Sequence, residues 1–325
     1  MLIVTNTKRF PLNWRCSCGE EGTSVIASTP SEFLRYKDEK NVVFVVDCDP
    51  GLGYRLAAAL WMRRSPALVS VDFVLRRPSG VRSRLLLPFR RLLLRRFQHH
   101  IHYFRDTSKF GEVYAIAADR FSHVPFKANL HFEPQPPADG SGEYILCFGR
   151  SLRDFDTFFD AVETLPYPAA IPEPNFEALN AHGARFARKL SALPRNVRLL
   201  PDTYTQDATK QILLAAKIVV LPILTSSLVA SGIGSCHNAM AAGKCVIGTE
   251  GPGMSDVFQK EALAVPPEDP KALAEMIRRV WEDDDLRRRT ALAGQQYASS
   301  QGGEPELYQR IIDDICSWQR RSGVQ

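Results

Sequence analysis

The densest group of residues that could perform chemistry lies between Ser231 and Gly253, in the sequence SGIGSCHNAMAAGKCVIGTEGPG. A Gly-x-Gly turn before a helix leaves backbone N–H groups unpaired at the positive end of the helix dipole, which suits a diphosphate. Glycine at 232 and 234 also lets a ligand approach the main chain closely. The same segment could be a plain glycine turn ahead of a buried helix, so by itself it leaves both interpretations open.

Two arginines follow the apolar run Tyr144–Phe148. We expect this run to be a parallel strand, and open α/β sheets bind ligands at the carboxyl ends of such strands. An arginine there keeps its charge and offers a two-pronged donor to phosphate oxygens. We therefore predict that Arg150 and Arg153 bind a phosphate-bearing ligand. The competing interpretation is that both are surface residues at a strand end.

Two further motifs in the first half are weaker. The sequence Asp47-Cys48-Asp49 follows an apolar run, a pattern with which some enzymes hold a nucleotide-bound cation. A three-residue match is common by chance, and turn chemistry before Pro50 explains it more simply. Gly51-x-Gly53 imitates a dinucleotide fingerprint, but Leu56 occupies the third glycine position. We expect no metal site here and no dehydrogenase.

The elements that position these residues alternate strand and helix in both halves of the chain. In the first half we expect strands at 41–47, 68–75, 101–104 and 121–126 and helices at 54–64 and 82–97, the latter kinked or broken at Pro88. In the second half we expect strands at 144–148, 196–200, 218–221 and 245–248 and helices at 156–164, 208–216, 236–242, 270–281, 286–297 and 307–320. This alternation predicts βαβ units with parallel sheets, and therefore an α/β protein.

The stretch 132–142 combines three prolines, two glycines and polar residues, which marks a linker. We place an N-terminal domain at 1–135, a C-terminal domain at 136–305, and at 306–325 a helix that packs back on the N-terminal domain.

The 325 residues carry no apolar run long enough to cross a bilayer and no signal-peptide layout, so we expect a cytoplasmic protein. The seven cysteines are scattered, and the lone Cys16-x-Cys18 pair is too little for a zinc site; we expect reduced thiols.

The net charge is only +5, but residues 76–105 contain nine arginines and no acidic residue. In the helix expected there, Leu85, Phe89, Leu92 and Leu93 share one face, and Arg84, Arg91 and Arg95 line another. This pattern is typical of a helix that rests on an anionic membrane surface. It also fits a helix with its leucines in the core and a solvated arginine face. Aromatic residues are not interleaved with the arginines, so we expect no nucleic-acid partner.

Several segments together resemble glycosyltransferase family 4, also called glycosyl transferases group 1, which has the GT-B fold. The family pattern EAMA-GKPVI and a glycine turn corresponds here to NAMAAGKCVIGTEGPG at 238–253. The following AVPPEDPKALAEMIRRVWEDDDLRRRTALAG at 264–294 resembles the family's next segment, and YILCFGRSLRDFDTFFDAV at 144–162 resembles the opening of its C-terminal domain. The resemblance is good over 144–297 and weaker over 41–130.

The resemblance implies two Rossmann-like domains whose parallel sheets face a central cleft. It implies a retaining, metal-independent hexosyltransferase that needs no cofactor beyond its co-substrate, a UDP- or GDP-sugar. The acceptor would be a glycan or a lipid-linked glycan in polysaccharide or glycolipid synthesis, reached by a peripheral enzyme on the inner face of the membrane. The donor would contact Ser231, Gly232, Ile233, Gly234, Ser235, Asn238 and Tyr204. Arg150 and Arg153 would stabilise the diphosphate that leaves the sugar.

The sequence departs from the family at a Glu-x7-Glu motif, where Ala230 and Asn238 replace the two glutamates. Asparagine can still hydrogen-bond a ribose hydroxyl, although without charge assistance. This loss leaves a second interpretation open, in which the chain is a degenerate, inactive homologue that serves as a binding or scaffold subunit. A third is a different enzyme of the same architecture, such as a sugar-nucleotide epimerase.

Overall fold

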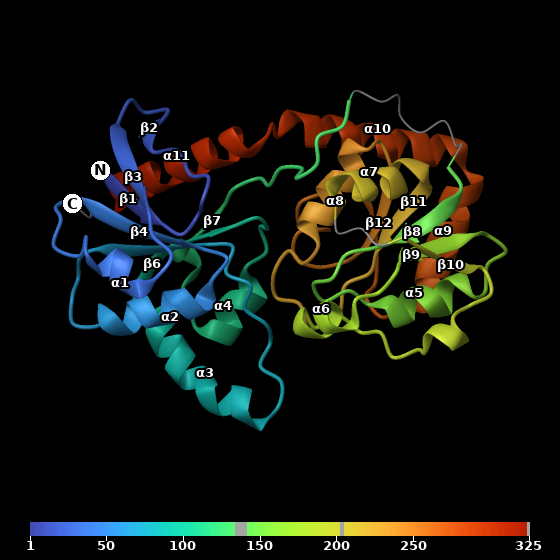
Figure 1. Cartoon of the computed structure of the whole chain (residues 1–325), viewed down its shortest axis with the longest axis horizontal. Coiled ribbons are helices and arrows are strands. Elements are labelled where there is room, and N and C mark those ends of the chain that lie inside the picture. Colours follow the sequence, from blue (N-terminus) through green and yellow to red (C-terminus); the bar gives the residue numbers. More distant parts are fainter. Residues whose placement is uncertain (134–141, 202–204, 324–325) are drawn as a thin grey trace. The chain divides into compact units, whose positions relative to one another are not determined.

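The computed structural model describes residues 1–133, 142–201 and 205–323 (Figure 1). They form two compact units, Met1–Pro125 with Glu304–Gln325, and Phe126–Gly303. The units divide after Pro125 and Gly303, whereas the sequence analysis placed the boundaries after residues 135 and 305. The second unit is therefore inserted, in chain order, between two parts of the first.

The first unit is built on a seven-stranded sheet with the order β2-β3-β1-β4-β5-β6-β7. Its strands are β1 (Leu2–Thr5), β2 (Asn13–Arg15), β3 (Glu21–Ile26), β4 (Val42–Asp47), β5 (Ala67–Val71), β6 (Phe97–His102) and β7 (Phe121–His123). All neighbours pair in parallel except β2, which forms an antiparallel hairpin with β3. The central strands β4 and β5 are buried almost throughout, as expected of apolar runs covered on both faces.

Helices cover both faces of this sheet. On one side lie α1 (Pro30–Leu34), α2 (Pro50–Ala59), α3 (Val81–Leu94) and α4 (Ser108–Tyr114), and on the other lies the long α11 (Glu304–Ser322) (Figure 1). The carboxylate of Asp314 on α11 contacts His99 Nε2 at 2.6 Å and accepts a hydrogen bond from Ser122 at 2.8 Å. The ring of Trp318 stacks on His99. These contacts join α11 to β6 and β7.

The second unit is built on a six-stranded parallel sheet with the order β10-β9-β8-β11-β12-β13. Its strands are β8 (Tyr144–Cys147), β9 (Ala169–Pro172), β10 (Val197–Leu200), β11 (Ala216–Leu221), β12 (Cys245–Thr249) and β13 (Leu263–Val265). Its helices are α5 (Phe155–Val162), α6 (Phe176–Ala181), α7 (Gln206–Ala215), α8 (Ile233–Ala241), α9 (Pro270–Glu282) and α10 (Asp284–Ser300). Alternate strand residues such as Ile145 and Val220 pack with α5 and α9 in one apolar core.

Several sequence-based expectations were wrong in detail. The helix expected at 82–97 continues through Pro88 and ends at Leu94, and Phe97 begins strand β6. A strand forms there because residues 97–102 pair with β5, and the Gln98 side chain accepts the N–H of Leu68 at 2.8 Å. Strand β9 was missed, since AAIP is short and carries no alternation.

The cysteines also depart from expectation. Cys16 and Cys18 are joined by a disulfide, so these two are not reduced thiols as the sequence analysis proposed. The other five cysteines are free, with Cys48 exposed and Cys147, Cys236, Cys245 and Cys316 buried. The short spacing in the chain allows this bond because residues 16–20 form the turn of the β2–β3 hairpin.

Candidate functional site

The second sheet has its topological switch point between β8 and β11, because the chain proceeds from β8 to β9 on one side and from β11 to β12 on the other. The loops that follow these two strands are joined by backbone hydrogen bonds. The N–H of Asp154 donates to the carbonyl of Pro222 at 3.0 Å, and the N–H of Leu224 donates to the carbonyl of Leu152 at 3.0 Å. Open α/β sheets bind ligands at such a point.

Arg153 lies at this junction with its side chain fully buried. A Cβ atom added to Gly149 would lie 2.6 Å from Arg153 Nη2, and one added to Gly232 would lie 2.8 Å from the same atom. The guanidinium therefore contacts the main chain of both glycine turns. Both glycines also have positive φ, +98° and +84°, so both positions favour glycine on two grounds.

The Arg153 guanidinium makes few hydrogen bonds with the described residues and no ion pair with them. Its Nη1 donates a long hydrogen bond of 3.5 Å to the carbonyl of Pro222, while Nε and Nη2 have no hydrogen-bond partner among the described residues. Burial lowers the pKa of this guanidinium, and within the described parts of the chain no carboxylate pairs with it. A buried cation without a partner costs several kcal/mol, so an anionic ligand that reached these donors would bind with a large gain.

The amino-terminal end of α8 lies beside this guanidinium. Gly232 is the N-cap residue, and no described side chain caps the helix. Ile233, Gly234 and Ser235 form its first turn, and Ser235 Oγ lies 3.1 Å from the position of a Cβ on Gly149. The positive end of the helix dipole and the Arg153 guanidinium thus converge at one place, as a phosphate site requires.

A buried ion pair positions the loop that carries Arg153. The carboxylate of Asp154 caps α5 through the N–H of Thr157 at 3.2 Å, and it accepts two hydrogen bonds from Arg185, at 2.8 and 2.6 Å. The backbone N–H of Arg185 also donates to the carbonyl of Arg153 at 2.8 Å. Arg185 stands far from the recognised motifs, so its role could not be predicted from the sequence.

The structure places the other predicted site residues differently. Arg150 is exposed, away from the buried position of Arg153. Ser231 exchanges a hydrogen bond with Ser227 at 2.8 Å between their hydroxyl oxygens. The carboxamide oxygen of Asn238 accepts the N–H groups of Asn129 and Leu130 at 2.8 and 3.0 Å, so its ribose contact stays a prediction. Tyr204 lies outside the described residues.

A carboxylate that sequence reasoning did not single out lies near the same loops. Glu268 Oε1 accepts hydrogen bonds from the Thr225 hydroxyl at 2.8 Å and from the Thr225 N–H at 3.2 Å. Its Oε2 lies 3.9 Å from Arg185 Nη1. Glu268 belongs to the AVPPEDP segment quoted above, so its position was available in the sequence, but nothing in the motif indicated this contact.

In the first unit, the Asp47–Asp49 motif has ordinary turn chemistry, as expected. Asp49 caps α2 by accepting the N–H of Leu52 at 2.8 Å. Asp47 accepts the Thr7 hydroxyl at 3.0 Å. Burial, and then the neighbouring Asp47, raise the pKa of Asp72 to about 7. Gly53 serves helix packing, because a Cβ there would lie 2.6 Å from the ring of Phe73.

The arginine-rich helix α3 presents apolar side chains to solvent. The exposed fractions are 74% for Leu85, 57% for Phe89 and 40% for Leu92, whereas Leu93 is buried. Of the four residues expected on one apolar face, Leu93 therefore packs in the core and the other three lie at the surface. Arg84 and Arg95 are exposed, and Arg91 donates to the carbonyl of Val113 at 2.8 Å. None of the described helices is long and apolar enough to span a bilayer.

Comparison with known proteins agrees with this geometry. Residues 143–283 match the model of the family glycosyl transferases group 1. The match covers less than half of the 325 residues. It contains β8, the Arg153 loop and α8, so the matched region includes the whole junction described above.

Solved structures resemble the whole chain. HepE from Anabaena in complex with UDP has a TM-score of 0.64 at 16% identity, over 89% of this chain and 82% of that one. Sucrose-phosphate synthase from Thermosynechococcus elongatus has a TM-score of 0.65 at 15% identity, over 99% and 89%. No curated protein sequence matches the chain. The GT-B fold with two Rossmann-like domains, expected from the sequence, is confirmed, and the resemblance to glycosyl transferases group 1 is confirmed over residues 143–283.

Proposed function

We propose that the protein transfers a hexose from a UDP- or GDP-sugar to a glycan or lipid-linked acceptor, with retention of configuration and without a bound metal. The observation that carries the proposal is the buried Arg153 guanidinium, which lies between two glycine turns beside the start of α8. Its Nε and Nη2 have no hydrogen-bond partner in the part of the chain that the structure describes. The similar HepE has been solved with UDP, with UDP and glucose, and with UDP-glucose, which supports a uridine nucleotide as the first donor to test.

The chemistry requires stabilisation of the diphosphate that leaves the sugar. Arg153 and the N–H groups at the start of α8 would bind its oxygens, and these groups supply positive charge without a cation. In a retaining reaction the acceptor hydroxyl attacks the face that the nucleotide leaves. A phosphate oxygen of the donor can then accept the hydroxyl proton, so the proposal assigns no protein side chain as the base.

The acceptor side of the proposal depends on α3. Its exposed apolar residues and its arginines have the chemistry of a helix that inserts shallowly into an anionic membrane, where each arginine contributes on the order of 1 kcal/mol. We therefore place the enzyme at the cytoplasmic face of a membrane, where a lipid-linked acceptor in polysaccharide or glycolipid synthesis would be within reach.

The first experiment is calorimetric titration of the full chain with UDP, GDP and their glucose conjugates, in the presence and absence of EDTA. We expect one nucleotide to bind, with the same affinity in EDTA. Arg153→Met should bind about 10- to 100-fold more weakly, since a hydrogen bond to a charged group is worth about 1.5 to 3 kcal/mol. Without ligand this variant should be at least as stable as the wild type, because it removes an unpaired buried cation.

The matched control is Arg279→Ala, which removes an exposed arginine of α9 and should leave the affinity unchanged. Equal affinity of the wild type and a well-folded Arg153→Met variant would remove Arg153 from the site. Binding that disappears with EDTA would contradict a metal-independent donor site. Failure to bind any nucleotide would favour the alternative of a scaffold subunit without activity.

A further inference from the structure

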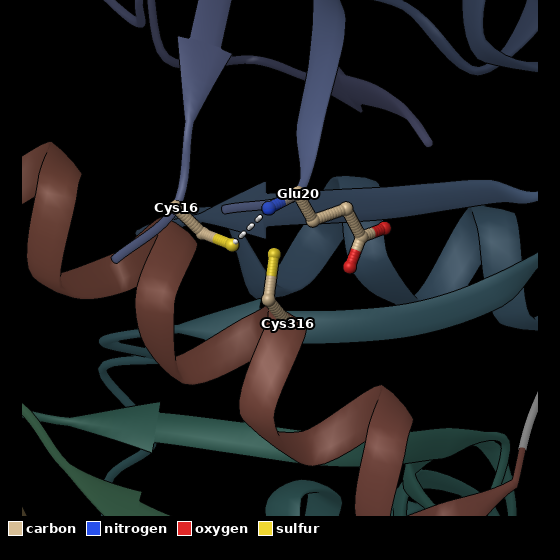
Figure 2. Close-up of side chains that lie close together, drawn as sticks. All are labelled: Cys16, Glu20 and Cys316. Carbon is tan, nitrogen blue, oxygen red and sulfur yellow. Dashed lines mark hydrogen bonds between the residues drawn. The ribbon is translucent and has the colours of Figure 1, made fainter. Parts of the chain in front are cut away.

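Three side chains with metal-ligand chemistry meet in the N-terminal unit. Cys16 follows β2, Glu20 precedes β3, and Cys316 lies on α11, about three hundred positions farther along the chain. One ligand atom from each, two sulfurs and a carboxylate oxygen, lie within 4.8 Å of one another. Figure 2 shows the sulfurs of Cys16 and Cys316 pointing toward each other, with the Glu20 side chain beside them. Cys16 and Cys316 are buried, so the sulfurs are screened from solvent.

The turn that carries Cys16 and Glu20 is held by its own backbone. Cys16 N–H donates to the Glu20 carbonyl at 2.8 Å, and Gly19 N–H donates to the Cys16 carbonyl at 2.9 Å. The Glu20 N–H donates a hydrogen bond to the Cys16 sulfur at 3.3 Å, which fixes the position of that sulfur in the turn. Gly19 has φ +89°, so the turn uses a backbone conformation that favours glycine.

A second set of contacts fixes this turn to α11. The Ser17 N–H and hydroxyl donate to the two carboxylate oxygens of Asp313 at 2.7 and 2.6 Å. The side chain of Gln309 donates to the Arg15 carbonyl at 2.9 Å. Because these bonds do not involve the sulfurs, they hold Cys316 opposite Cys16 whatever the state of the thiols. The ligand set is therefore positioned by the fold before any ion binds.

Cys18 adds a third sulfur. It is bonded to Cys16 in the structure and is exposed, so a reductant can reach it. A small dithiol would donate two electrons and two protons to this disulfide and become a disulfide itself, leaving two thiols on the chain. Before reduction Cys316 supplies one free thiol at this place, and after reduction Cys16, Cys18 and Cys316 supply three.

We propose that the reduced protein binds one Zn²⁺ ion through the sulfurs of Cys16, Cys18 and Cys316 and a carboxylate oxygen of Glu20. Three thiolates and one carboxylate supply four ligands that zinc accepts in tetrahedral geometry, whereas Mg²⁺ and Ca²⁺ require oxygen ligands. Each thiol releases its proton as the ion binds. The ion ties the β2–β3 hairpin to α11, and oxidation of Cys16 and Cys18 to the disulfide releases it. This inference does not depend on the proposed transferase reaction.

The test uses the full chain without a polyhistidine tag, reduced with a phosphine, freed of metal with a chelator, and titrated anaerobically with Co²⁺. We expect one Co²⁺ per chain, with the near-ultraviolet charge-transfer and visible bands of tetrahedral thiolate ligation. Zn²⁺ should displace Co²⁺ and raise the melting temperature, because it binds the folded chain. The oxidised chain should show neither effect.

Four variants make the test specific. Cys18→Ser and Glu20→Gln change solvent-accessible side chains, so both variants should fold. Cys18→Ser should weaken Co²⁺ binding by roughly 100-fold or more, and Glu20→Gln should weaken it less. Cys316→Ser should abolish the thiolate spectrum. Cys48→Ser, which changes an exposed thiol outside the cluster, should bind as the wild type does. No thiolate band in the reduced wild type, or an unchanged band in Cys316→Ser or Cys18→Ser, would overturn the proposal.

Discussion

Arg185 donates two hydrogen bonds to the carboxylate of Asp154, from Nε at 2.8 Å and from Nη2 at 2.6 Å, and its own N–H donates to the carbonyl of Arg153. The same residue therefore neutralises a fully buried carboxylate and fixes the backbone of the buried arginine beside it. These contacts help hold the loop of Arg153 against the loop after β11, while Nε and Nη2 of Arg153 have no hydrogen-bond partner among the described residues.

Arg185→Ala should therefore lower both stability and nucleotide affinity. Asp154 would keep its burial and lose its partner, but Arg185 is 40% exposed, so we expect a loss of about 2 kcal/mol rather than the full cost of breaking a buried pair. Urea unfolding measures this loss. The control is Arg188→Ala, whose partners Asp160 and Glu163 are about half exposed; its cost should stay below about 1 kcal/mol. Equal losses in the two variants would contradict a special role for Arg185.

Gly232→Ala tests the contact between the glycine turn and Arg153. The new Cβ would lie 2.8 Å from Nη2 and would also strain a residue with φ +84°. We expect a stability loss of about 1 to 2 kcal/mol from the backbone and a larger, separate loss of nucleotide affinity in calorimetric titration. Gly80→Ala is the control for the contact, since φ is also positive, +79°, and nothing lies within 4 Å of its Cβ position. With ψ of 163° its backbone lies in a region confined almost to glycine, so it should lose at least as much stability and no affinity. A similar loss of affinity there would refute the contact argument.

The exposed apolar residues of α3 can be tested with vesicles. Leu85→Glu combined with Phe89→Glu should reduce binding to vesicles of phosphatidylglycerol and phosphatidylcholine roughly tenfold or more, because two apolar side chains no longer leave water. Stability in urea should change by less than about 0.5 kcal/mol, since both residues are exposed. Leu292→Glu, on the 42% exposed leucine of α10, is the control and should bind as the wild type does. Vesicle binding that is unaffected by the double change would exclude this face of α3 from the membrane contact.

The buried histidines of β6 predict a loss of stability in acid. Burial lowers the pKa of His102 to about 3, and neither ring nitrogen has a partner in the part of the chain that the structure describes. Below about pH 6.5 the unfolded chain therefore binds more protons than the folded chain, and stability falls as the pH falls toward 3. The pKa of His100 is lowered in the same direction, first by burial.

His102→Phe should flatten this pH dependence, because the ring already lies among Phe104, Phe110 and Phe121 and a phenyl ring cannot take up a proton. Urea midpoints measured at pH values from about 7 down to about 5 give the slope. His182→Gln changes an exposed histidine and should leave the slope as in the wild type. If His102→Phe had the wild-type slope, another group would have to account for the acid sensitivity.

Much of the architecture could be predicted from local patterns. Continuous β-branched runs such as Val42–Asp47 indicate strands buried on both faces, and the alternation with helices indicates parallel sheets. The end of α3 could not be predicted in this way, because Leu94 and Phe97 are equally apolar. What separates them is pairing with β5, a contact between segments distant in the chain. Short strands such as Ala169–Pro172 form for the same reason.

The candidate site was predictable only where a motif was continuous in the chain. Gly232 and Arg153 stood in recognised segments, and the structure brings them together. Whether an arginine after β8 faces solvent or the interior depends on the packing of two loops, so Arg150 and Arg153 could not be distinguished beforehand. Arg185 and Cys316 were out of reach, since each acts through a partner that the sequence does not place beside it.

The insertion of the second unit between Pro125 and Glu304 sets the order in which the protein can form during synthesis. The sheet face that holds His99 and Ser122 is made early, but Asp314 and Trp318, which cover it, leave the ribosome only after the whole second unit. At roughly 5 to 20 residues per second, that apolar face stays uncovered for on the order of ten seconds or more. Truncation before α11 should therefore leave the first unit aggregation-prone.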